Sequence, residues 1–297
     1  MNADATGERP IDPLGPALLF CPGSRPDRFD KAHRAADHVV LDLEDGVAPD
    51  GKDRALAEVL AFVRTRAERV LVRVNRPATR RGQDEIPALA AAGVARFVLP
   101  KVESAADVDA ALETAGAGRG VEVVVTIETA RGVLALGQIL ARPGIAAVSW
   151  GPYDLAADIG LRGVRDEAGG YLPPLAHARD AMVLHAAAAG IPVFDTVTTE
   201  IRTLAQTERD AAQAALLGFA GKLAIHPSQV PAIRAAFMPG AAEVERSRRL
   251  VAAAAGSAVF LFEGEMVDAP ILRRARMLIA LAERCERNRA AASSSRS

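Results

Sequence analysis

The stretch VEVVVTIETARGVLALGQILARPGIAAVSWG, residues 121–151, contains one complete strand–helix–strand repeat. Its first part, residues 121–129, and its last part, residues 145–151, are rich in Val, Ile and Ala, as expected of strands that are buried on both faces. The segment between them has helical character. Because strands joined by such helices form parallel sheets, the stretch predicts an α/β protein.

Six further apolar runs of the same kind lie before and after this repeat, again separated by longer segments of helical character. Eight parallel strands with helices between them close into a TIM (β/α)₈ barrel, which is the predicted fold. A doubly wound open sheet is the alternative. The six runs are residues 17–23, 38–45, 70–75, 96–103, 191–197 and 222–227.

Signals at the ends of the expected helices support this alternation. Ser104 stands before an Ala-rich helical segment, where it can cap the helix N-terminus. Gly93 and Gly190 follow two other Ala-rich segments, at the place where a glycine commonly ends a helix.

The ends of the 297-residue chain differ in composition from its middle. Residues 1–15 are polar and Pro-rich, and we expect them to be a disordered extension. Residues 16–255 have the length of a barrel, which is about 250 residues. Residues 256–288 follow after eight strands have been counted, so they form an appended segment that ends in an amphipathic helix. Residues 289–297 are of low complexity and are expected to be a disordered tail.

The overall composition excludes several classes of function. The net charge is −1, so the chain has no general positive field for nucleic acid or for an anionic membrane. No run of about 18 apolar residues is present, and the first residues lack the order of a secretory signal. A cytoplasmic protein is the expectation. Cys21 and Cys285 match no metal-binding spacing and are interpreted as small hydrophobic residues.

Ionisable residues gather where the expected strands end. A charged side chain in a buried strand is costly unless it is paired or bound to a metal, and TIM-barrel active sites lie at the C-terminal ends of the strands. Each residue alone has a structural explanation, such as a buried Arg73–Asp42 ion pair or a core His226. Together they predict a site. The residues are Asp42, Glu44, Asp45, Arg73, Asn75, Lys101, Glu103, Glu128, Asp154, Asp195 and His226.

Carboxylates without a cluster of Cys and His favour a hard divalent cation, Mg²⁺ or alternatively Mn²⁺, over zinc. Glu128 and Asp154 follow neighbouring strands, so their side chains can converge on one metal ion. Glu44 and Asp45 are then candidates for bonding the water ligands of the metal.

Other catalytic templates are not supported by the sequence. No phosphate-binding glycine motif, no H-E-x-x-H and no G-x-S-x-G is present. Lys101 could form a Schiff base, but the acids around it would keep its amine protonated.

At these residues the sequence resembles the CoA-ester lyases related to the citrate lyase beta subunit and to malyl-CoA and citramalyl-CoA lyases. The resemblance runs from Leu19 to about Arg276 and depends on many short pieces taken together. The pieces are LFCPGSRPDRFDKA, VVLDLEDGVAPDGKDRA, VRVNRP, VLPKVESAADV, IETARGV, WGPYDLAADIG, GFAGKLAIHPSQV and EGEMVDAP.

The resemblance implies a TIM barrel with Mg²⁺ on Glu128 and Asp154, the two residues already selected by their position. It also implies that Arg73 faces the substrate oxygens. Asp268, in the piece EGEMVDAP, would be an acid/base group delivered by the appended segment of a neighbouring subunit. That segment would close over the next barrel in a trimer or hexamer.

The resemblance further points to the residues that contact the acyl-CoA substrate. Arg25 and Lys31 would meet phosphates of CoA, and Gly151 and Pro152 of the piece WGPYDLA would border the substrate. Two departures from the family pattern, Trp150 and Thr198, fall where the acyl pocket is expected.

The expected activity is Mg²⁺-dependent cleavage or formation of a 3-hydroxyacyl-CoA such as malyl-CoA or citramalyl-CoA, with acetyl-CoA and a 2-keto acid as the other side of the reaction. Three alternatives stay open: a citrate lyase beta subunit that acts on a carrier-protein thioester, a CoA-independent class II aldolase, and a barrel that serves only as a scaffold.

Overall fold

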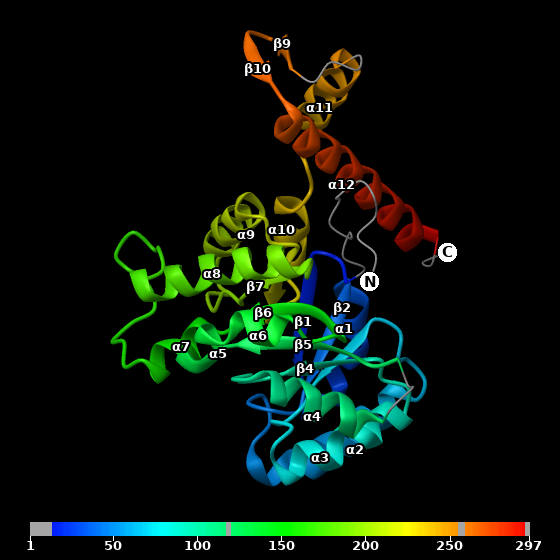
Figure 1. Ribbon diagram of the computed structural model, residues 1–297. Coiled ribbons are helices and arrows are strands. Elements are labelled where there is room, and N and C mark those ends of the chain that lie inside the picture. The colour runs from blue at the N-terminus through cyan, green and yellow to red at the C-terminus, as the bar shows by residue number, and fades with distance from the viewer. Residues whose placement is uncertain (1–13, 117–119, 255–258, 295–297) are drawn as a thin grey trace. The chain divides into compact units, whose positions relative to one another are not determined.

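The computed structural model describes residues 14–116, 120–254 and 259–294, with Arg284 and residues 287–294 described by their backbone alone. Eight parallel strands pair in the order of the sequence and close into a barrel (Figure 1). The strands are β1 (Ala17–Pro22), β2 (His38–Asp42), β3 (Val70–Arg73), β4 (Arg96–Leu99), β5 (Glu122–Ile127), β6 (Ile145–Trp150), β7 (Val193–Asp195) and β8 (Gly221–Ala224).

The predicted (β/α)₈ barrel is therefore confirmed, and the open sheet is wrong because β1 pairs with β8. Every strand ends before the end of its apolar run. For example, β2 ends at Asp42, so Glu44 and Asp45 lie in the connection that follows it. The polar residues at the ends of the runs thus lie on the connections between strands and helices, where sheet pairing no longer fixes the direction of the backbone.

Helices connect the strands. Ser104 forms a capping box with Asp107 at the start of its helix, and Gly190 adopts a left-handed conformation (φ 69°) at the end of another, as predicted. The helical segments are η1 (Pro26–Arg28), α1 (Phe29–Ala35), η2 (Pro49–Gly51), α2 (Lys52–Val63), α3 (Arg80–Ala91), α4 (Ala105–Ala115), α5 (Ala130–Leu134), α6 (Leu136–Leu140), α7 (Pro152–Asp158), α8 (Pro173–Ala189), α9 (Ala205–Leu217) and α10 (Gln229–Ala236).

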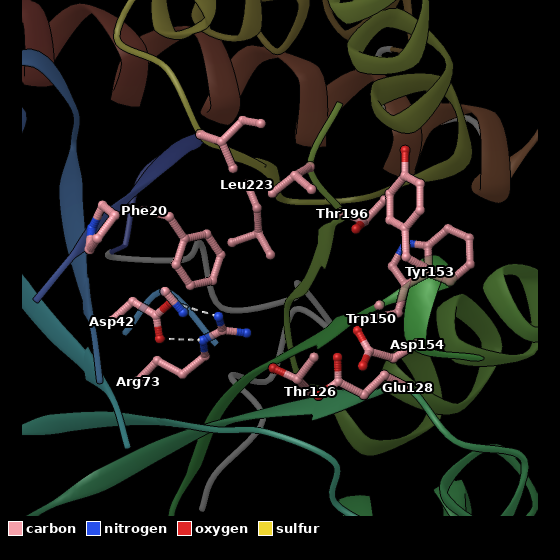
Figure 2. A pocket seen from close by; sticks show the side chains of 15 residues that line it. Phe20, Asp42, Arg73, Thr126, Glu128, Trp150, Tyr153, Asp154, Thr196 and Leu223 are labelled. Carbon is pink, nitrogen blue, oxygen red and sulfur yellow. Dashed lines mark hydrogen bonds and ion pairs between the residues drawn. The ribbon is translucent and has the colours of Figure 1, made fainter. Parts of the chain in front are cut away.

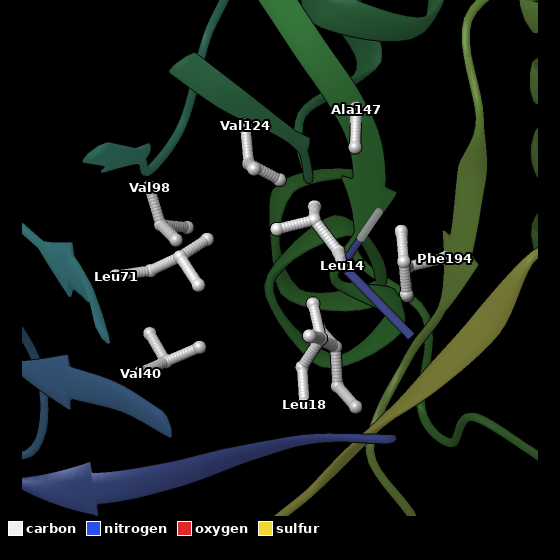
Figure 3. Close-up of a cluster of buried hydrophobic side chains, with 9 residues drawn as sticks. Leu14, Leu18, Val40, Leu71, Val98, Val124, Ala147 and Phe194 are labelled. Carbon is white, nitrogen blue, oxygen red and sulfur yellow. The ribbon is translucent and has the colours of Figure 1, made fainter. Parts of the chain in front are cut away.

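Apolar side chains from the strands fill the interior of the barrel (Figure 3). Leu14 is 1% exposed and belongs to this cluster, although the sequence assigned it to the disordered extension. The barrel thus begins before β1, while residues 1–13 lie outside the described part. The cluster consists of Leu14, Leu18, Val40, Leu71, Val98, Val124, Ala147, Phe194 and Leu223.

A second compact unit begins at Ala235, earlier than the boundary at residue 256 that the sequence suggested. It contains α11 (Ala241–Ala253), an antiparallel hairpin of β9 (Phe260–Phe262) and β10 (Glu265–Val267), and α12 (Ala269–Ser294). Leu250 of α11 packs with Leu272 of α12, which is why α11 belongs to this unit.

The helix α12 continues to Ser294, into the segment for which the sequence predicted disorder. Its alanines at residues 290–292 favour helix, which accounts for the difference. Residues 295–297 lie outside the described part of the chain. Among the described residues, no helix has both the length and the apolar character needed to cross a bilayer.

Candidate active site

A pocket of about 310 Å³ lies at the C-terminal ends of the barrel strands (Figure 2). One side of it is charged and polar, and the other is formed by aromatic and aliphatic side chains. The lining residues are Phe20, Pro22, Asp42, Gly46, Arg73, Thr126, Glu128, Trp150, Gly151, Tyr153, Asp154, Thr196, Val197, Leu223 and Ile225. The barrel face on which we expected the ionisable residues to lie therefore contains a cavity.

Glu128 directly follows β5 and is 3% exposed. Its Oε1 atom accepts a hydrogen bond of 2.7 Å from the backbone N–H of Lys101. The other oxygen, Oε2, occupies the space beside Gly151: a Cβ atom built on this glycine would lie 2.4 Å from it. Gly151 is held to the end of β5 by its own N–H, which donates to Ile127. The glycine thus leaves room for the Glu128 carboxylate.

Asp154 stands in the first turn of α7, a helix that begins at Pro152, and its side chain is 42% exposed. It lines the same pocket as Glu128, and Figure 2 shows the two carboxylates side by side. Burial and the charge of Asp154 raise the pKa of Glu128 to about 7. A cation bound beside the two carboxylates would offset the effect of Asp154 on Glu128.

The donor set is small. Among the described residues, no group of three or more Asp, Glu, His or Cys side chains is arranged to hold a metal ion. Two carboxylates nevertheless match what Mg²⁺ requires, because this ion keeps several waters and takes one or two protein carboxylates. Glu128 and Asp154 are the residues that could hold it.

Lys101 places its ammonium group among acids. Its Nζ donates to Glu44 at 2.7 Å and to Asp45 at 3.2 Å, and lies 3.6 Å from Asp154. Although burial opposes the charge, these acids raise the pKa of Lys101 above its ordinary value. A Schiff base requires a neutral amine, so the geometry supports the expectation that Lys101 stays protonated. Its backbone has a positive φ of 51°, a conformation that is uncommon for residues other than glycine, and its N–H donates to Glu128.

Arg73 ends β3 and forms the ion pair with Asp42 that the sequence offered as a structural explanation. Its Nε and Nη2 atoms each lie 2.7 Å from a carboxylate oxygen of Asp42, and Nη1 lies 3.1 Å from Glu44. The guanidinium also lies over the ring of Phe20, 4.9 Å from its centroid. Arg73 lines the pocket all the same, so the ion pair fixes the orientation of a cation that faces the cavity.

The loop that carries Glu44 is tied down by a second polar cluster. Lys52 donates to the backbone oxygens of Leu43 and Glu44 and to the side chain of Asn75. Asn75 in turn donates from its backbone and its side chain to Glu85, a carboxylate that is 1% exposed. Hydrogen bonds from Lys52 and Asn75 thus fix the position of the acidic loop after β2.

Several residues selected from the sequence lie away from the pocket lining. Arg25 pairs with Asp27 at 2.8 Å, and both side chains are exposed. Lys31 is exposed on α1. Pro152 is buried at the start of α7, where it helps to begin the helix. Contacts of Arg25, Lys31 and Pro152 with a substrate stay predictions.

The other rim residues have structural partners or lie elsewhere. Asp195 is fully buried and accepts hydrogen bonds from Trp150, Arg179 and Lys222. His226 is exposed and bonds Ser228. Asp268 follows β10 and belongs to the C-terminal unit. Its delivery from a neighbouring subunit stays a prediction.

Nine lining residues were not selected from the sequence, and four of them have polar or aromatic side chains. Thr126 hydrogen-bonds Ser149 on the neighbouring strand, and the hydroxyl inside the apolar run VVVTI is the signal that could have identified it. Tyr153 stands beside Asp154 and bonds Thr199. Phe20 and Thr196 line the pocket from β1 and from the end of β7, but nothing in the sequence separates them from residues of the core.

Comparison with known proteins identifies the family of the chain. Residues 17–227 match the family model described as HpcH/HpaI aldolase/citrate lyase. The chain belongs to this family. The resemblance inferred from the sequence is therefore confirmed, and so is the expectation of a carbon–carbon lyase.

Curated relatives have related names. The citrate lyase subunit beta-like protein of Mycobacterium tuberculosis is 37% identical over 89% of this chain and 94% of its own length. Two proteins of Cereibacter sphaeroides also match. A (3S)-malyl-CoA thioesterase is 31% identical over 90% of this chain and 94% of its own length, and an L-malyl-CoA/beta-methylmalyl-CoA lyase is 33% identical over 89% of this chain and 93% of its own length.

A solved structure gives the same result. The crystal structure of protein CitE from Mycobacterium tuberculosis, in complex with magnesium, acetoacetate and coenzyme A, superposes with a TM-score of 0.82 at 37% identity. The match covers 91% of this chain and 98% of that one. The similarity thus covers nearly the whole length of a protein that was crystallised with magnesium and coenzyme A.

Proposed function

We propose that this lyase uses Mg²⁺, or alternatively Mn²⁺, to cleave a 3-hydroxyacyl-CoA such as malyl-CoA or citramalyl-CoA into acetyl-CoA and a 2-keto acid, or to form it from them. The observation that carries the proposal is the pair Glu128 and Asp154, two acids at the ends of neighbouring strands that face one cavity. It is supported by the magnesium and coenzyme A in the M. tuberculosis structure and by the relative named as a malyl-CoA lyase.

Glu128 and Asp154 would hold the metal ion, and Glu44 and Asp45 would bond its water ligands. A bound divalent ion acidifies a hydroxyl group and polarises a carbonyl oxygen, which is the chemistry that this cleavage needs. Lys101 bonds both Glu44 and Asp45, so it would orient these two acids.

Arg73 would stabilise the negative charge that develops on oxygen as the carbon–carbon bond breaks. Its guanidinium is already oriented by Asp42, so no reorganisation is needed at that moment. The loss of such a group typically costs about 10²-fold or more in rate. Gly151 would contribute by leaving space for Glu128 and for the substrate.

Asp268 would transfer the proton at the enolate carbon: it would donate this proton during cleavage, while solvent water accepts the proton that the hydroxyl group loses, and both transfers would reverse during condensation. We propose that it comes from the C-terminal unit of a neighbouring subunit in a trimer or hexamer. Arg25 and Lys31 would contact phosphates of CoA. The Arg25–Asp27 pair is exposed, and exposed pairs are weak, so a phosphate can replace Asp27.

The direct test is an assay with Mg²⁺ against malyl-, methylmalyl-, citramalyl- and citryl-CoA, in which keto acid and free thiol are measured separately. Release of keto acid without thiol identifies a lyase. Release of thiol would reveal hydrolysis of the thioester, the activity named for the thioesterase relative. Absence of keto acid from all four esters would refute the proposal.

Variants test the residues. Glu128→Gln and Asp154→Asn should abolish metal-dependent cleavage while circular dichroism shows an intact fold. Glu122→Gln is the matched control, because Glu122 lies at the opposite end of β5 and pairs with Arg96. Rates like those of the unchanged protein in Glu128→Gln and Asp154→Asn at saturating Mg²⁺ would overturn the metal assignment.

The origin of Asp268 has its own test. Asp268→Asn should lose turnover but keep binding of the CoA ester. Mixing this variant with Glu128→Gln should restore activity if the two groups of one site come from different subunits. No restoration, after subunit exchange has been shown by mass spectrometry, would place Asp268 in the same subunit as its Glu128.

A further inference from the structure

Trp150 is the only tryptophan in the chain, and it forms part of the pocket wall. It ends β6, directly before Gly151, and is 2% exposed. Its indole N–H donates a hydrogen bond of 2.9 Å to Oδ1 of Asp195, the last residue of β7. A large side chain at the edge of the pocket is therefore held by a neighbouring strand.

Asp195 is an unusual anchor because it is fully buried and charged. Its other oxygen, Oδ2, lies 3.1 Å from Nζ of Lys222 and 3.2 Å from Nη2 of Arg179. Burial opposes ionisation, but these two cations hold the pKa of Asp195 below its usual range. Lys222 also donates to the backbone oxygen of Thr196. The carboxylate that receives the indole N–H is thus ionised and fixed in orientation.

The ring of Trp150 is held on a second side by Tyr171. The two ring centroids lie 5.0 Å apart with an interplanar angle of 67°, the edge-to-face arrangement that aromatic pairs favour. Arg165 lies over Tyr171 at 4.2 Å and donates to its hydroxyl at 3.0 Å. Trp150 therefore cannot rotate away from the pocket without losing a charge-assisted hydrogen bond and an aromatic contact.

The other lining residues limit which substrate groups can lie beside Trp150. Phe20, Val197 and Leu223 are apolar. Among the described lining residues, Arg73 is the one cationic side chain, and Asp42 and Glu44 already engage its guanidinium. A second carboxylate on the acyl group would be buried there without a counter-charge, which is costly.

We propose that Trp150, held in place by Asp195, sets the size of the acyl substituent that the pocket accepts. The accepted substituent is hydrogen or a small alkyl group, and a carboxymethyl branch is rejected. Trp150 is then the specificity-determining residue, and Asp195 is the residue that positions it. This inference rests on the proposed cleavage of hydroxyacyl-CoA esters.

Trp150→Phe is the central test, because phenylalanine keeps an aromatic ring but is smaller and has no N–H group. Asp195 keeps Lys222 and Arg179, so the variant has no uncompensated buried charge. The measurement is kcat/KM for malyl-CoA, citramalyl-CoA and citryl-CoA, which carry hydrogen, a methyl group and a carboxymethyl group on the same hydroxyl-bearing carbon. The ratio of the methyl-bearing to the unsubstituted ester should rise about tenfold, as expected for one methyl group in an apolar pocket. Citryl-CoA should stay poor, since no cation has been added.

The role of Asp195 is tested by spectroscopy. With 5-fluorotryptophan incorporated, the single tryptophan gives one ¹⁹F resonance from the pocket wall. Asp195→Asn should shift or broaden this resonance and move the substrate ratio in the same direction as Trp150→Phe. Asp37→Asn is the control: Asp37 pairs with Arg234 and bonds the N–H of Ala17, at the start of β1. It should leave both readouts unchanged.

The outcomes separate the inference from the function on which it rests. If the unchanged protein cleaves none of the hydroxyacyl-CoA esters, the proposed function fails. If it cleaves them but the ratio in Trp150→Phe stays within about twofold of its original value, the specificity role is refuted. An unchanged ¹⁹F resonance and ratio in folded Asp195→Asn would refute the positioning role. Should Asp195→Asn fail to fold, Asp195→Glu takes its place in both readouts, because it keeps the negative charge beside Lys222 and Arg179 but moves the oxygen that accepts the indole N–H.

Discussion

Gly151→Ala is a small change with a large expected effect on the metal site. The backbone at this position has φ −121° and ψ 93°, which alanine adopts without strain. The new Cβ atom would lie 2.4 Å from Oε2 and 2.9 Å from Cβ of Glu128, whereas ordinary contacts begin at 3.4 Å. To restore normal van der Waals contact, the carboxylate must therefore move by about 1 Å, and the backbone of Glu128 or of residue 151 by about 0.5 Å.

The cost of this displacement should appear in function and not in folding. A misplacement of about 1 Å in a catalytic arrangement can cost about 10²-fold in rate. We expect kcat/KM to fall by about that factor and Mg²⁺ affinity to fall about tenfold or more. The fold should survive, because Glu128 faces a cavity and can turn into it.

Isothermal titration with Mg²⁺, steady-state kinetics and thermal unfolding together test this prediction. Gly137→Ala is the control: it lies in α6, and the nearest atoms to its added Cβ are those of His185 at 3.5 Å. In the double variant Gly151→Ala/Glu128→Asp the acid is shorter, so the two changes should cost less together than their sum. Unchanged Mg²⁺ affinity and kcat/KM in folded Gly151→Ala would refute the steric argument.

Two further predictions concern residues whose pKa is shifted. Burial lowers the pKa of His38 to about 4 from 6.5, against the hydrogen bond that its Nδ1 donates to Leu14, so the unfolded state takes up the proton first as pH falls between these values. The free energy of unfolding should fall by up to about 3 kcal/mol across this window, and denaturant titrations of His38→Gln should show a smaller fall. For Lys101, borohydride added with the 2-keto acid should leave the intact mass unchanged. A reduced adduct on this lysine would contradict the pairing with Glu44.

The sequence predicts the barrel and its active face for a clear physical reason. Strands buried on both faces are continuous apolar runs, so acids such as Glu128 and Asp154 stand out where the runs end. Parallel strands bring these ends to one side, and position alone then places the acids together. The same reasoning could not decide how Arg73 is used, because the pattern fits both an ion pair and a pocket cation, and the structure contains both.

Other features depend on distances between segments that are far apart in the chain. The hydrogen bond from Trp150 to Asp195 joins residues 45 positions apart, and no local sequence pattern predicts it. Lys101 has a positive φ and its N–H donates to Glu128, but nothing about a lysine in the sequence predicts either feature. The start of the C-terminal unit was missed because α11 has the composition of a barrel helix, and its packing against α12 alone assigns it.

The charges around the pocket imply an order of binding. The residues are the acids Asp42, Glu44, Asp45, Glu128 and Asp154 and the cations Arg73 and Lys101. By formal charge, five acids against two cations give the site an excess of three negative charges, which repels the carboxylate of a keto acid. A divalent ion reduces the excess to one, so the metal must bind before the substrate. Quenching of Trp150 fluorescence by a 2-keto acid should therefore require Mg²⁺. Equal quenching in the presence of a chelator would contradict this order, because it would mean that Arg73 and Lys101 alone outweigh the acids that pair with them.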